Sequence, residues 1–183
     1  MKKIACLGWG SLIWDPRELE VQQGWFHDGP ILPIEFSRIS KDKRVTLVVD
    51  HKSKWPVRVL WALMTTDDEN VACDLLRKRE DIPEKNISDI HFVRATDSLE
   101  SVDEVEKKIK MEIIEWLNLK QLDMAIWTGL PGERTIQEIL THLSGLRGNE
   151  RNHAEKYIRK APKQIDTYYR RAIEAKFGWA PED

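Results

Sequence analysis

The order of the periodic patterns along the chain constrains the fold most, because strand-like runs fill the first half and helical spacing dominates the second. Short apolar or alternating runs, rich in β-branched and aromatic residues and bounded by turn-forming residues, predict strands. These runs are residues 2–7, 31–40, 44–50 and 57–64. Charged, turn-like linkers join the last three, so we predict that they form an antiparallel meander.

Helical spacing begins near residue 67. The stretch Asp67–Glu80 opens with capping residues and predicts a helix, and residues 87–94 predict a further strand. Ser101 begins an S-x-x-E capping box that predicts the start of the next helix. A strand over 123–130 and two or three helices over about 134–177 follow. We therefore predict an α+β fold, with a mainly antiparallel sheet curled toward a small barrel and helices packed on it.

Length and composition favour one soluble globular domain over residues 1–183, with a helical C-terminal part at about 134–177. The 183 residues are enough for one core, and hydrophobic residues make up 41% and charged residues 33%. A net charge of -2 gives no overall positive charge for binding nucleic acid or an anionic membrane, and it leaves a local basic patch open. No apolar run is long enough to span a membrane, so we predict a cytoplasmic protein. Oligomeric state is left open.

Metal and thiol chemistry find no support in the sequence. The five histidines show no metal-ligand spacing, so we predict no metal. Cys6 and Cys73 form no C-x-x-C pair and lie among apolar neighbours, where cysteines pack as small hydrophobes. The basic, aromatic stretch Tyr157–Arg171 has the composition of an RNA-binding segment, but a buried aromatic face and a solvated basic face are the commoner explanation, which the overall acidity of the chain favours.

A glycine-rich bend follows the first predicted strand, in the sequence KKIACLGWGSLIWDP (residues 2–16). The backbone N–H groups of Gly8–Leu12 are suited to a concave anion site, because glycine allows left-handed angles and close approach to a ligand. A tight strand exit is the alternative reading. The bend does not match a dinucleotide fingerprint, because Ile13 takes the third glycine position and Asp28 lies in a turn, so a nucleotide-dependent enzyme is left as a distant third alternative. The phosphate-binding loop G-x-x-x-x-G-K-[ST] is also absent.

Glu80 is the candidate acid or base of this chain. Stepping by four along the predicted helix, Ala72 and Leu76 lead to Glu80, so the apolar stripe turns this carboxylate toward the interior. A partly buried carboxylate is suited to proton transfer. The alternative is a structural ion pair or a carboxylate that emerges into solvent where the helix ends.

Together the two features resemble the γ-glutamylcyclotransferase-like superfamily, most closely its ChaC-type branch, which degrades glutathione. The bend GWGSLIWDP resembles the family's loop G-Y-G-S-L-I-W-N-P, RVTLVVD (44–50) is similar to the next strand, and LLRKRE (75–80) is similar to the segment that carries the catalytic glutamate. The matching loop positions are Gly8, Gly10, Ser11, Leu12, Ile13, Trp14 and Pro16. Trp9 replaces the family's tyrosine. The resemblance covers roughly residues 1–95 and is weaker beyond them.

The resemblance implies a γ-glutamylcyclotransferase-like fold and an activity that converts a γ-glutamyl amide or peptide to 5-oxoproline and a free amine. Glu80 takes the general acid/base role, and the backbone of Gly8, Trp9, Gly10, Ser11 and Leu12 binds the γ-glutamyl substrate. This lyase-type reaction needs no water, metal or cofactor. Arg38, which alternates with Phe36 on its strand, is a candidate partner for a substrate carboxylate, or else it forms a surface ion pair. The alternative function is a non-catalytic, carboxylate-binding or regulatory domain.

Overall fold

The computed structural model describes residues 1–182 and divides them into two compact units that alternate along the chain. The first unit holds residues 1–8, 15–32 and 58–129, and the second holds 9–14, 33–57 and the rest of the described chain from 130. Such a division does not by itself separate one domain from two, so a single domain over 1–183 stays a prediction. The mixed α+β class is confirmed.

A four-stranded sheet forms the centre of the first unit, in the order β6-β1-β8-β7. The strands are β1 (Ile4–Gly8), β6 (Leu60–Leu63), β7 (Ile90–Arg94) and β8 (Met124–Thr128). Strand β1 pairs antiparallel with β6 but parallel with β8, and β7 pairs antiparallel with β8. All five residues of β1 are buried, which is why that strand is a continuous apolar run instead of an alternating one.

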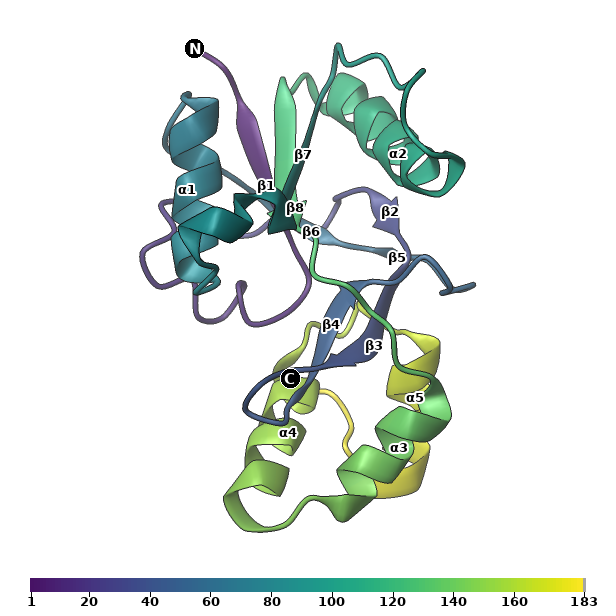
Figure 1. Cartoon of the computed structure of the whole chain (residues 1–183). Coiled ribbons are helices and arrows are strands. Elements are labelled where there is room, and N and C mark those ends of the chain that lie inside the picture. Colours follow the sequence, from purple (N-terminus) through teal and green to yellow (C-terminus); the bar gives the residue numbers. More distant parts are fainter. Residues whose placement is uncertain (183) are drawn as a thin grey trace. The chain divides into compact units, whose positions relative to one another are not determined.

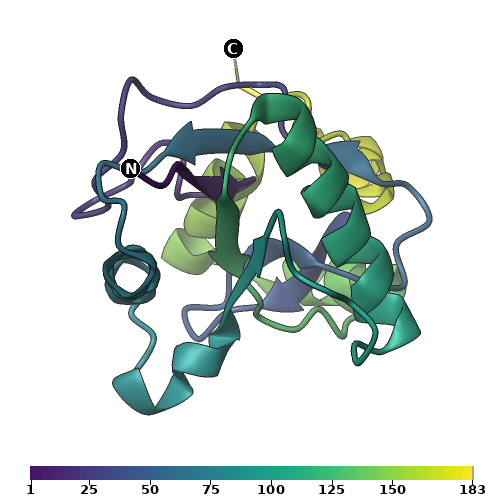
Figure 2. The ribbon, with the colours of Figure 1, turned by 90° about the horizontal axis from the view of Figure 1, so that it is seen from above.

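Two helices cover the opposite faces of this sheet, as both ribbon views show (Figures 1 and 2). They are α1 (Glu69–Arg79) and α2 (Glu104–Lys120), and a short 3-10 helix, η1 (Glu84–Asp89), precedes β7. Asp68 caps α1. The predicted capping box at Ser101 is wrong: the Asp103 carboxylate accepts from the amides of Val105 and Glu106, so α2 begins at Glu104.

The predicted meander and the small barrel are corrected by the strand pairing. Strand β3 (Ile34–Ile39) pairs antiparallel with β4 (Val45–Val49) in the second unit, as predicted, but the third run divides into β5 (Val57–Arg58) and β6. Strand β5 pairs with the two-residue β2 (Ile31–Leu32), while β6 pairs with β1. The strands of residues 1–182 thus form three separate sheets and no closed barrel. Pro33, which has no N–H to donate to a ladder, divides the 31–40 run.

Three helices pack on the β3–β4 hairpin of the second unit, which confirms the helical C-terminal part. They are α3 (Ile136–Gly145), α4 (Gly148–Lys160) and α5 (Tyr168–Phe177). Arg170 of α5 is 1% exposed and ties the end of α4 to α5. Its guanidinium donates to four backbone carbonyls, those of Ile158, Ala161, Pro162 and Ile165.

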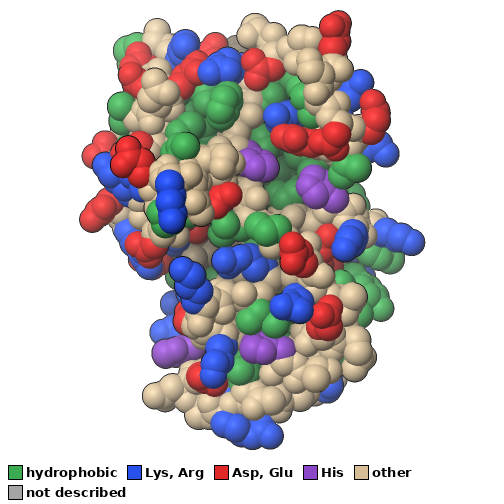
Figure 3. Space-filling model, viewed as in Figure 1, with side chains coloured by type: hydrophobic (Ala, Val, Ile, Leu, Met, Phe, Trp, Pro, Cys, Tyr) green, Lys and Arg blue, Asp and Glu red, His purple; other side chains and the backbone are tan. Residues whose placement is uncertain are grey.

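Charged side chains of both signs intermingle over the face of the molecule seen in Figure 3. That face therefore carries no large surface of a single charge. Among the described residues, no helix is long and apolar enough to cross a membrane.

Candidate functional site

The loop Trp9–Trp14 is anchored in the second unit by its aromatic residues. The Trp9 indole is buried, and its Nε1 donates to the carbonyl of Leu47 at 3.2 Å. The Ile13 amide donates to the Gly10 carbonyl at 3.0 Å and closes a turn. Among the described residues of this unit, by contrast, the amides of Gly10 and Leu12 have no acceptor. Two N–H groups of the predicted cradle, both on buried residues, thus donate to no acceptor within this unit.

Glycine is required in this bend for space and not for backbone angle. Positive φ values occur at Gly24, Gly148 and Gly178, but not at Gly8 or Gly10. In the first unit, a Cβ added at Gly8 would lie 2.6 Å from Cζ3 of Trp25. In the second unit, a Cβ added at Gly10 would come within 3.0 Å of Tyr157 Oη. The prediction of left-handed angles is therefore wrong here, because close approach of an aromatic ring explains each glycine.

Glu80 lies in the first unit, directly after α1, and its side chain is 21% exposed. The predicted inward turn is supported, because Arg79 beside it is only 4% exposed and donates from Nη1 to Glu80 Oε1 at 3.0 Å. Burial raises the pKa of the Cys6 thiol, and the Glu80 charge adds to this effect.

Arg79 also links the end of α1 to the backbone that follows the loop. Its Nε and Nη2 donate to the Asp15 carbonyl at 3.1 and 2.6 Å, while its Nη1 holds Glu80. Asp15 is the residue after Trp14 in the chain. One buried guanidinium of the first unit therefore binds both the candidate base and the Asp15 carbonyl.

The predicted site residues divide between the two units. Gly8 and Glu80 belong to the first, whereas Trp9, Gly10, Ser11, Leu12 and Arg38 belong to the second. Arg38 lies in β3 opposite Thr46 and is half-buried. A single site that combines Glu80 with the whole loop stays a prediction, as does the role of Arg38.

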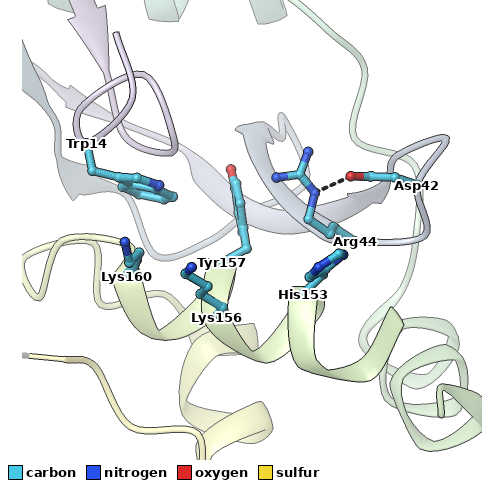
Figure 4. Close-up of a pocket in the computed structure, with 7 residues that line it drawn as sticks. All are labelled: Trp14, Asp42, Arg44, His153, Lys156, Tyr157 and Lys160. Atoms are coloured by element: carbon cyan, nitrogen blue, oxygen red, sulfur yellow. Dashed lines mark ion pairs between the residues drawn. The ribbon is translucent and has the colours of Figure 1, made fainter. Parts of the chain in front are cut away.

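A cavity of about 320 Å³ lies in the second unit, and sequence reasoning missed it (Figure 4). Its lining consists of Trp14, Asp42, Arg44, His153, Lys156, Tyr157 and Lys160. Four of these residues stand at i, i+3, i+4 and i+7 on α4, which is the spacing of one helix face. That spacing was the available signal, but Tyr157 and Lys160 also fit a helix with a buried aromatic face and a solvated basic face.

Tyr157 is the centre of this cavity and lies between Trp14 and Arg44 (Figure 4). Its ring meets the Trp14 indole edge-on, with 5.4 Å between centroids. The Arg44 guanidinium carbon lies 5.4 Å from the centroid of the same ring. The Tyr157 hydroxyl accepts from the Leu47 amide at 3.4 Å. Tyr157 therefore belongs both to the cavity and to the packing of Gly10.

Asp42 partly neutralises the positive charge of the cavity. Its carboxylate lies 2.5 Å from Arg44 Nε and accepts from Ser40 Oγ at 2.5 Å. Burial by itself would raise the pKa of this carboxyl, but the Ser40 hydrogen bond and the Arg44 charge together lower it. Asp42 is therefore ionised at neutral pH.

Among the described residues, no group of three or more histidine, cysteine, aspartate or glutamate side chains is placed to hold a metal ion. Comparisons of the chain with protein-family models, with curated proteins and with solved structures found no match. The function must therefore be argued from the residues themselves.

Proposed function

We propose that the chain is a γ-glutamylcyclotransferase with a γ-glutamylcyclotransferase-like fold, in which Glu80 is the general acid/base. The observation that carries the proposal is the double contact of Arg79, which holds the Glu80 carboxylate and the Asp15 carbonyl at the end of the loop. A catalytic carboxylate must be held in one position, because small misplacements are costly in rate. The buried Arg79 guanidinium, which donates to Glu80 and to the Asp15 carbonyl, meets that need within the first unit.

The reaction is an intramolecular aminolysis. The α-amine of the γ-glutamyl group attacks its own δ-carbonyl, a C–N bond forms, and the original amide C–N bond breaks. The products are 5-oxoproline and a free amine. The α-ammonium loses one proton to Glu80 before its nitrogen attacks and a second as it becomes the lactam N–H. Glu80 passes these protons to the leaving nitrogen, which departs as an ammonium, so that no net proton is consumed or released. The Arg79 charge beside Glu80 suits a carboxylate that begins the cycle ionised.

The loop supplies donors for the negative charge of the substrate. The Gly10 and Leu12 amides, which have no acceptor among the described residues of the second unit, are suited to a substrate carboxylate or to the developing oxyanion. Replacement of the family's tyrosine by Trp9 leaves these backbone donors intact. The indole instead fixes the loop through Leu47.

The test is 5-oxoproline production from a panel of γ-glutamyl amides and peptides that includes glutathione. We expect turnover by the wild-type protein and a loss of about 10²–10⁴-fold in kcat for Glu80→Gln, the usual contribution of general acid/base catalysis. Glu84→Gln is the matched control, because Glu84 is an exposed carboxylate of the same unit. Absence of 5-oxoproline from every substrate, or full activity of Glu80→Gln, would contradict the proposal.

The ion pair with Arg79 favours one alternative, in which Glu80 serves structure and the chain is a non-catalytic carboxylate-binding domain. This alternative predicts that γ-glutamyl compounds raise the melting temperature through binding to the native state, without turnover. Thermal unfolding with and without the same panel of compounds distinguishes the two functions.

A further inference from the structure

The cavity of the second unit carries a concentrated positive charge. Arg44, Lys156 and Lys160 face one carboxylate, that of Asp42, which leaves a formal charge of +2 with His153 neutral. The ion pairs formed within residues 1–182 include Arg44 with Asp42, but none of them involves Lys156 or Lys160. Both ammonium groups are on exposed residues of α4. The surroundings thus leave two cations uncompensated at the mouth of a cavity.

Part of the cavity wall is aromatic. Trp14 and Tyr157 line the cavity and meet edge-on, and Lys156 and Lys160 lie beside them on α4 (Figure 4). A volume of about 320 Å³ is at the lower end of the range for small-molecule sites and exceeds the space that one inorganic ion fills. A ligand that matches these walls has an apolar or planar body as well as negative charge.

We propose that this cavity binds a small organic dianion, with phosphate or carboxylate oxygens at Lys156, Lys160 and Arg44 and an apolar body against Trp14 and Tyr157. A guanidinium and two ammonium groups pair with oxyanions through charge-assisted hydrogen bonds. The site uses neither Glu80 nor the cyclisation reaction. It therefore stands independently of the proposed function.

A small molecule fits these residues better than a nucleic acid strand does. Strand binding needs a basic groove that follows several phosphates. The cations here gather at one cavity, and the face shown in Figure 3 mixes both signs of charge. The test therefore includes a single-stranded oligonucleotide as a competing ligand.

The test is isothermal titration calorimetry of the full chain at low ionic strength with three probes: phenyl phosphate, phthalate and inorganic phosphate. We expect one equivalent of an aromatic dianion to bind more tightly than inorganic phosphate, because only the aromatic probes contact both rings. Tight binding of phenyl phosphate alone assigns the site to phosphate esters, and tight binding of phthalate alone assigns it to carboxylates. Affinity falls with added salt, because exposed charges are screened.

Lys156→Gln combined with Lys160→Gln should weaken binding of the aromatic dianion several-fold and by up to about 25-fold, since each exposed charge pair contributes up to about fivefold. Lys54→Gln, an exposed lysine of the same unit, is the matched control and should change affinity less than about twofold. We expect the double variant and the control variant to keep the fold, because all three lysines are exposed, and circular dichroism checks this. Three results would overturn the proposal: no probe binds at millimolar concentration, the double variant binds as wild type does, or a single-stranded oligonucleotide binds more tightly than either aromatic dianion.

Discussion

Gly10→Ala is the sharpest test of how the loop is built. The new Cβ would come within 3.0 Å of Tyr157 Oη, a separation that real Cβ atoms essentially never show. The Tyr157 ring cannot swing away freely, because it is 6% exposed and packs against Trp14. Overpacking of this kind costs about 1–3 kcal/mol, and about 2 kcal/mol lowers the melting temperature of a chain of this size by roughly 6 °C.

The loss of stability caused by Gly10→Ala should depend on one atom, Tyr157 Oη. In a Tyr157→Phe background, Oη is absent, and the nearest remaining atom to the new Cβ is Cζ at 3.4 Å, an ordinary contact. Gly10→Ala should then cost less than about 1 kcal/mol, which gives a coupling of roughly 1–2 kcal/mol between the two sites. Urea unfolding of the four proteins of this cycle measures the coupling. An equal cost of Gly10→Ala in both backgrounds would refute steric exclusion by Tyr157 as the reason for the glycine.

Two further predictions concern charged groups that hold each unit together. Arg170→Met should destabilise the chain by about 3 kcal/mol or more in urea unfolding, because it leaves four carbonyls without their buried donor, whereas the exposed Arg171→Met should cost less than about 1 kcal/mol. Arg94 and then Lys2 lower the pKa of Glu69 from 4.5 to about 2. A carboxyl whose pKa is lowered by folding stabilises the folded state at pH values above its unfolded-state pKa. This stabilisation is lost as the pH falls from about 4.5 to about 2. Glu69→Gln should therefore be less stable than wild type at pH 7, with a difference that shrinks through this range; a difference independent of pH would contradict the pairing.

Element type could be predicted from the sequence where the signal is local. The helix α1 and the strands β1, β4, β7 and β8 lie within the predicted ranges or extend one residue past them, because hydrophobic period and capping chemistry act over a few residues. Pairing could not be predicted in the same way. Strand β8 pairs parallel with β1, although most of the first unit's sequence separates the two strands. Strand β6 pairs with β1, although the predicted meander placed its run beside β4. Partner choice depends on contacts between residues far apart in the chain, which no local pattern contains.

In the candidate site, too, local features could be predicted from the sequence and contacts between distant residues could not. Glu80 and the glycines of the bend could be singled out from helix stepping and from residue type. The reason for the glycines could not, since Trp25 and Tyr157 approach them from distant parts of the sequence. Arg79 was no more predictable as a link, because its partner Asp15 is 64 residues away.

The position of Tyr157 joins the two proposals while keeping their tests separate. Its hydroxyl excludes a side chain at Gly10, and its ring forms the central wall of the cationic cavity. A ligand in the cavity therefore bears on the same side chain that sets the backbone of the loop, so Tyr157 variants should disturb both sites. Lys156 and Lys160 line only the cavity, and Glu80 lies outside the second unit altogether. Loss of dianion binding in the lysine variants with unchanged 5-oxoproline formation would thus establish two sites, whereas loss of both activities together would indicate that the loop depends on the occupancy of the cavity.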